Sequence, residues 1–179
     1  MRISTKKLVL CALMTSIVFI ITFTPFLQIP SPMTQGYYNI GDAAIMIAAI
    51  LLGRRVGCIA GGVGSALADI VAGYYIYAPA TLIIKGIEGY IIGVIGNSKN
   101  GVPSRLRQVV AVAAGGLEMV LGYFVYQATV MKAINRDLGM ASIIADLPGN
   151  LIQGALSAVL ALIFLAVLYR TKAVKNLLR

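Results

Sequence analysis

The sequence predicts an all-α integral membrane protein with six transmembrane helices. Its composition is the first reason: of the 179 residues, 59% are hydrophobic and only 12% are charged, and the mean hydropathy is +0.90. A soluble domain carries a charge on about a quarter of its residues. The second reason is that apolar runs recur along the chain with short polar breaks between them. The third is that the basic residues gather in those breaks.

The apolar runs set the expected bounds of the helices. A hydrocarbon core of roughly 30 Å requires about 20 helical residues. The second run is short, so it either extends back through Tyr37 and Tyr38 or is partly buried by its neighbours. Pro148 is expected at the start of the last helix, because proline is tolerated in the first turn. The expected spans are residues 7–27, 40–53, 56–73, 79–96, 108–131 and 146–170.

The first run is expected to be a retained helix and not a cleaved signal peptide, since no small-residue cleavage pattern follows it. Residues 1–179 are expected to form a single membrane-embedded domain.

Basic residues indicate the orientation. On the opposite side of the expected membrane only Lys132 and Arg136 are basic, against Asp137 and Asp146. Cytoplasmic loops are enriched in Lys and Arg, so both termini are expected in the cytoplasm and the protein in the plasma membrane of a bacterium. The net charge of +9 then reflects topology and not a nucleic-acid partner. The basic residues on the cytoplasmic side are Arg2, Lys6, Lys7, Arg54, Arg55, Lys99, Arg105, Arg107, Arg170, Lys172, Lys175 and Arg179.

Ionisable residues in or beside the spans require an explanation, because burying one costs roughly 2.5–3.5 kcal/mol on insertion scales. Asp42 is interpreted as a cap of the second span, with Asn39 nearby. A bland explanation for Lys85 is an ion pair with Glu88 or Asp69 that makes insertion tolerable. The five residues concerned are Asp42, Asp69, Lys85, Glu88 and Glu118.

Polar side chains on three spans favour a cavity in the outer half of the bundle. Helical spacing puts Thr81, Lys85 and Glu88 on one face, and Asn150, Gln153 and Ser157 on another. Glu118 lies between glycines on a third helix. Packing alone does not require charge on three helices, so we expect a substrate site formed by Lys85, Glu88, Glu118, Asn150 and Gln153. The tyrosines 37, 38, 74, 75 and 77 in the outer loops are either rings that stack on a ligand or an interfacial aromatic belt.

The sequence lacks the motifs that are typical of several other classes of protein. The glycine-rich stretch CIAGGVGSALAD has no lysine for a phosphate, so we expect it to pack helices closely. With no histidine and two cysteines far apart, neither a metal site nor a cofactor is expected. No nucleophile has a plausible base, so the chain is not expected to be an enzyme. A membrane enzyme using Glu88 or Glu118 as general acid–base stays an alternative.

One long segment, NIGDAAIMIAAILLGRRVGCIAGGVGSALADIVAGYYIYAPATLIIKGIEGYIIG, resembles the substrate-binding S components of energy-coupling factor (ECF) vitamin transporters, in the riboflavin-type group. The resemblance is dense over residues 5–96. It implies a six-helix protein that captures a vitamin-like molecule from outside and docks on a membrane scaffold, the T component, and two cytoplasmic ATPases.

Residue roles follow from the same resemblance. Small residues of the first helix, here Ala12 and Ser16, are expected to contact the scaffold. The connection over residues 27–38, including Gln35, is expected to cap the substrate, and Tyr77 to stack on it. Within the group we favour a hydroxymethylpyrimidine or pyridoxine-type ligand, with a riboflavin-specific subunit or a stand-alone small-solute carrier as alternatives.

Overall fold

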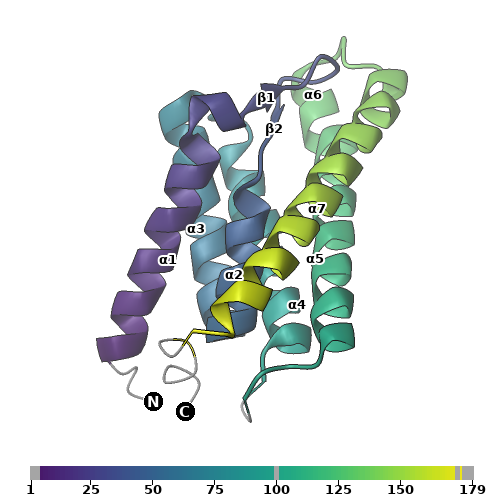
Figure 1. The fold of residues 1–179 in the computed structure, drawn as a ribbon. Helices are drawn as coiled ribbons and strands as arrows, with labels where there is room; N and C mark the ends of the chain where they lie inside the picture. The colour runs from purple at the N-terminus through teal and green to yellow at the C-terminus, as the bar shows by residue number, and fades with distance from the viewer. Residues whose placement is uncertain (1–4, 99–100, 172–173, 175–179) are drawn as a thin grey trace.

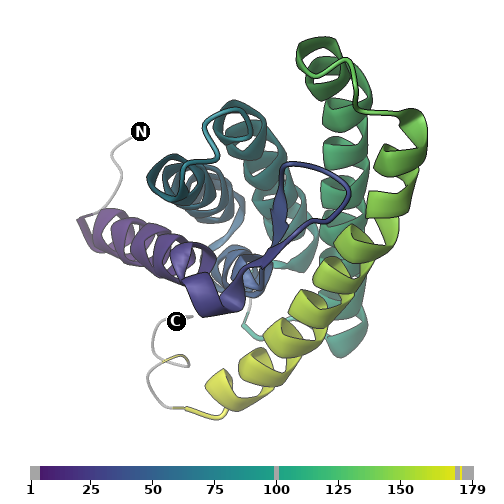
Figure 2. The ribbon, with the colours of Figure 1, turned by 90° about the horizontal axis from the view of Figure 1, so that it is seen from above.

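Six main helices form a bundle, and the connection between the first two crosses over one end of it (Figure 1, Figure 2). This connection, residues 24–40, is called the cap below. The computed structural model describes residues 5–98, 101–171 and 174. The elements are α1 (Thr5–Phe23), the 3₁₀ turn η1 (Pro25–Leu27), β1 (Ile29–Pro30), β2 (Tyr37–Tyr38), α2 (Gly41–Leu52), α3 (Arg54–Ala72), α4 (Ala78–Gly96), α5 (Arg105–Tyr126), the π-helix η2 (Gln127–Met131), α6 (Lys132–Ile134) and α7 (Met140–Leu168).

The all-α bundle is confirmed. Within the described residues five helices are long and apolar enough to cross a membrane: α1, α3, α4, α5 with its continuation to Ile134, and α7. Helix α2 has only 12 residues, nine of them buried. It does not extend back through Tyr37 and Tyr38, which form β2 and pair antiparallel with β1. Burial by neighbouring helices therefore explains why the second run is short.

The start of the last helix was expected at residue 146, and this is wrong. Helix α7 begins at Met140 and continues through Pro148. The proline removes one intrahelical hydrogen bond. Helix α7 nevertheless runs on, because side chains on both sides of the proline, Ile143 and Asn150 among them, are buried against the bundle. Asp146 thus lies inside the helix and not in the preceding loop.

The ends of the helices separate the charges. The first residues of α3 and α5 and the last residues of α7 lie at the end of the bundle opposite the cap (Figure 1). This end carries Arg54, Arg55, Arg105, Arg107 and Arg170. By the positive-inside rule it faces the cytoplasm, and the cap faces outward. Five of the basic residues used for the orientation, Arg2, Lys99, Lys172, Lys175 and Arg179, lie outside the described residues.

Helices α3 and α4 approach each other backbone to backbone through glycines. A Cβ atom at Gly61 would lie 2.5 Å from the carbonyl oxygen of Lys85, and one at Gly57 would lie 2.5 Å from that of Gly89. The prediction that the glycine-rich stretch packs helices is confirmed. The contact also fixes the backbone from which the Lys85 side chain projects.

Replacing Gly61 by Ala should lower the free energy of unfolding by about 1–3 kcal/mol, the usual range for overpacking. Gly86→Ala is the matched control, because a Cβ atom there would meet Cys58 at an ordinary 3.6 Å. Alanine is also the better helix former, so the control should be neutral or stabilising. Titration with SDS in mixed micelles measures the free energy of unfolding of both variants. Equal stability of the two variants would contradict the close approach at Gly61.

Candidate functional site

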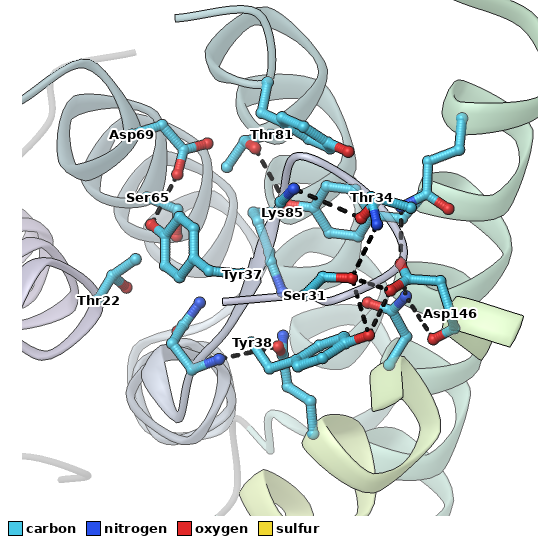
Figure 3. A pocket seen from close by; sticks show the side chains of 17 residues that line it. Thr22, Ser31, Thr34, Tyr37, Tyr38, Ser65, Asp69, Thr81, Lys85 and Asp146 are labelled. Carbon is cyan, nitrogen blue, oxygen red and sulfur yellow. Dashed lines mark hydrogen bonds between the residues drawn. The ribbon is translucent and has the colours of Figure 1, made fainter. Parts of the chain in front are cut away.

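A polar cavity lies beneath the cap, enclosed by α3, α4, η2 and α7 (Figure 3). Its free volume is about 30 Å³, which is room for about two water molecules. Admitting a ring-sized molecule therefore requires lining side chains or the cap to move. The lining residues are Thr22, Ser31, Thr34, Gly36, Tyr37, Tyr38, Asn39, Ser65, Asp69, Tyr77, Thr81, Lys85, Tyr123, Gln127, Asp146, Asn150 and Gln153.

Lys85 forms the inner wall of the cavity and is 2% exposed. Its ammonium group donates to Oδ1 of Asp42 on α2. Oδ2 of the same carboxylate accepts from Nε2 of Gln153 on α7 at 2.8 Å. The backbone N–H of Asn39 donates to Oε1 of Gln153 at 2.9 Å, which fixes the orientation of that amide. The Nζ atom of Lys85 also lies 5.5 Å from the ring centre of Tyr123, within the range of a cation–π contact.

Asp42 does not cap α2, so that interpretation is wrong. The first amide of the helix, at Gly41, donates instead to Oδ1 of Asn39 at 2.7 Å. The Asp42 carboxylate turns inward because Lys85 supplies a positive charge there. Lys85 does form the expected ion pair with Glu88, whose Oε2 lies 3.5 Å from its ammonium group. It also forms a closer pair, with a hydrogen bond, to Asp42, which was not expected.

Asp146 holds the cap to the bundle. Oδ1 accepts from the hydroxyls of Ser31, at 2.5 Å, and Tyr38, and Figure 3 shows both cap residues converging on it. Oδ2 accepts from Gln127 of the π-helix at 2.8 Å and from Asn150 at 3.1 Å. This carboxylate is 2% exposed. Donors from the cap, the π-helix and α7 thus meet at a single acceptor group.

Three of the outer-loop tyrosines, Tyr37, Tyr38 and Tyr77, line the cavity. Tyr37 donates to Oδ1 of Asp69 at 2.7 Å, and its ring centre is 4.5 Å from that of Tyr74. Tyr77 is buried, with its ring centre 5.5 Å from that of Tyr126. Tyr75 is 67% exposed, which agrees with a place in an interfacial aromatic belt.

The tyrosines of the cap stay protonated. Burial, and next the negative charge of Asp69, raises the pKa of Tyr37 well above its usual value. Burial and the hydrogen bond to Asp146 raise the pKa of Tyr38 to about 12. Both hydroxyls therefore remain hydrogen-bond donors throughout the physiological range of pH.

The expected site residues fall into three groups. Tyr77, Lys85, Asn150 and Gln153 line the cavity together. Glu88 is fully buried one helical turn further in, and Glu118 is half-buried; neither lines the cavity. Gln35 is exposed on the cap and does not line the cavity, whereas its neighbours Thr34 and Gly36 do. Ligand contacts by all seven residues stay predictions.

Sequence reasoning missed Asp146 and Gln127 as site residues. Asp146 was assigned to the outer loop because the last span was expected to start there. Asp146 lies one helical turn before Asn150, at the same kind of spacing that separates Asn150, Gln153 and Ser157. The helical pattern that predicted those three residues therefore also indicates Asp146. Gln127 lies in a π-helix, whose extra residue per turn breaks the helical period.

Ala12 and Ser16 lie on the outer side of α1, away from the cavity. Both are exposed, and the hydroxyl of Ser16 donates to the carbonyl oxygen of Ala12 at 3.0 Å. The hydroxyl is thereby satisfied within the helix, so this face is smooth and presents little polarity. Such a face suits contact with lipid or with another membrane helix.

Known proteins resemble this chain over nearly its whole length. Residues 2–170 match the family described as ECF-type riboflavin transporter, S component. The thiamine precursor transporter HmpT of Lactococcus lactis subsp. cremoris is 31% identical over 93% of this chain and 89% of its own. An uncharacterized protein of Pyrococcus woesei is 48% identical over 100 residues, which are 56% of this chain and 65% of that protein. The chain therefore belongs to the S components of ECF-type riboflavin transporters, which are substrate-binding membrane subunits of importers and not enzymes.

Proposed function

We propose that this S component captures a thiamine precursor of the hydroxymethylpyrimidine type from the outer side of the membrane. The observation that carries the proposal is the pairing of carboxylates and tyrosine rings in a narrow cavity. Asp69 and Asp146 line it together with Tyr37, Tyr38, Tyr77 and Tyr123. The resemblance to HmpT along 93% of the chain supports the same substrate class.

The chemistry of an aminopyrimidine suits this lining. Its exocyclic amine can donate to a buried carboxylate, while its ring nitrogens and hydroxyl can accept from Lys85, Gln153 or a tyrosine hydroxyl. A flat ring gains about 0.5–1.5 kcal/mol beyond its area burial from each well-placed aromatic neighbour. A ligand that lacked one of these groups would leave a buried polar atom unpaired, at about 1–3 kcal/mol. A three-ring flavin would require far more displacement of the lining than a single ring.

Uptake then requires partners, because the chain has no nucleotide-binding motif. The cap opens, the ligand enters, and the hydrogen bonds from the cap to Asp146 then form again. The loaded subunit docks on a T component through the face of α1 that carries Ala12 and Ser16. Two cytoplasmic ATPases supply the energy that turns the site toward the cytoplasm.

The substrate class is tested by gentle purification, with mass spectrometry of the small molecule and proteins that accompany the chain. Calorimetry on the emptied protein then compares hydroxymethylpyrimidine, pyridoxine, thiamine and riboflavin. We expect hydroxymethylpyrimidine to bind most tightly and two ATPases to co-purify. Arg136→Ala, a change on the exposed outer loop, is the control that should bind as the unaltered protein does.

Two results would overturn this proposal. Tighter binding of riboflavin would assign the cavity to the flavin and not to a single ring. Purification without ATPases, as an oligomer of this chain alone, would favour a stand-alone carrier.

A further inference from the structure

The four ionisable groups below the cavity do not balance in charge. Asp42, Lys85, Glu88 and Glu118 bring three carboxyl groups and one amine to the inside of the bundle, and the first three are at most 2% exposed. If all were ionised, a net charge of −2 would be held among membrane helices. Such charge is costly unless it is paired or neutralised.

Asp42 is the carboxylate with the closest contact to Lys85. Each of its oxygens accepts a hydrogen bond, one from Lys85 and one from Nε2 of Gln153. The amide cannot be turned around, because its Oε1 already accepts from the backbone N–H of Asn39. Both oxygens thus act as acceptors, and one of the two donors is a cation, which favours the carboxylate over the protonated acid. Asp42 and Lys85 therefore neutralise each other.

Glu88 shares the single charge of Lys85 with Asp42 and has the more distant contact of the two. It is 0% exposed, and neither carboxyl oxygen accepts a hydrogen bond from any described residue. The ammonium group of Lys85 is 3.5 Å from Oε2 but is directed to Asp42. A buried carboxylate without donors is among the most expensive groups in a protein, whereas the protonated acid is neutral.

Within the part of the chain that the structure describes, no second cation on the neighbouring helices pairs with Glu88. Helix α3 faces this part of α4 with the backbone of its glycines, and its one nearby acid, Asp69, interacts with Lys85 and Tyr37. On α5, Gly115 packs beside the Cγ atom of Glu88. Helix α5 also brings the second carboxyl group, Glu118, which repels a negative charge on Glu88. Helix α2 contributes Asp42, also negative. On α7 the polar groups that follow Asp146 are neutral, among them Gln153 and the buried hydroxyl of Ser157.

We propose that Glu88 is a proton-binding site beneath the substrate cavity, coupled to the cavity through Lys85. The proton stays on Glu88 while Asp42 engages the ammonium group. When the negative charge of Asp42 is removed, the ammonium group turns to Glu88, and the proton leaves to water.

Infrared spectroscopy of the purified full-length protein tests this without any ligand, so its outcome is independent of the proposed substrate. A protonated acid has a carbonyl stretch that a carboxylate lacks and that shifts in D₂O. We expect this band at neutral pH in the unaltered protein and in Glu118→Gln. Glu88→Gln, which has the shape of the protonated acid, should lose the part of this band that Glu118→Gln keeps.

Asp42→Asn tests the coupling. It frees Lys85 to pair with Glu88, so the pH at which the band disappears should fall by about one to three units. The absence of the band from the unaltered protein, or its loss in Glu118→Gln and not in Glu88→Gln, would overturn the proton site. A band that disappears at the same pH in Asp42→Asn and in the unaltered protein would overturn the coupling. If Asp42→Asn does not fold, the Glu88→Gln and Glu118→Gln spectra still decide the proton site.

Discussion

Replacement of Lys85 by Met should lower the free energy of unfolding by about 3–5 kcal/mol, the loss expected when one member of a buried ion pair is removed. Asp42 would keep its hydrogen bond from Gln153 but lose its cation while remaining 1% exposed. The new methionine fills a similar volume, so the loss reports on charge and not on packing. SDS titration in mixed micelles measures the effect.

The double variant Lys85→Met with Asp42→Asn separates charge from shape. With neither charge left, the penalty for an unpaired ion disappears, and most of the lost stability should return. Should the single and double variants be equally unstable, the ion pair would not be what stabilises this part of the bundle. A single variant as stable as the unaltered protein would contradict the burial of Asp42.

Replacement of Asp146 by Ala should release the cap. The change removes the acceptor of Ser31, Tyr38, Gln127 and Asn150 at once, and each buried donor left unpaired costs about 1–3 kcal/mol. Hydrogen exchange of residues 31–38 should accelerate, and affinity for hydroxymethylpyrimidine should fall at least tenfold, which corresponds to about 1.4 kcal/mol.

Two further variants serve as controls for Asp146→Ala. Tyr38→Phe removes a single donor and should have a smaller effect on both measurements. Asp137→Ala removes an exposed carboxylate on the same side of the membrane and should change neither. If Asp146→Ala left exchange of the cap unchanged, the cap would be held by contacts other than these hydrogen bonds.

Hydropathy predicted most of the bundle, because a bilayer admits few alternatives to helices of about 20 apolar residues. It was least informative for α2, which is shorter than a span and is buried by other helices. It also placed the start of α7 too late, since Pro148 was assumed to begin a helix that in fact runs through it.

Spacing along a single helix predicted several residues that line the cavity, whereas their role in binding stays a prediction. Lys85 and the pair Asn150 and Gln153 were found by their spacing, and they line the cavity. Their partners could not be found in this way. Asp42 is 43 residues from Lys85 along the chain, and only the packing of α2 beside α4 brings the two together. The cap has an irregular backbone without helical or strand periodicity, so no sequence pattern predicts its contact with Asp146.

The shortness of α2 has a consequence for how the protein is made. At 1.5 Å per residue its 12 residues extend about 18 Å, well below the thickness of the hydrocarbon core. During synthesis this segment, with its buried aspartate, emerges before Lys85 exists. It has no stable place in the bilayer until α3 and α4 have followed it. Assembly of the central helices is thus a late and concerted event, and a variant that lacks Lys85 should reach the membrane in a smaller amount than the unaltered protein.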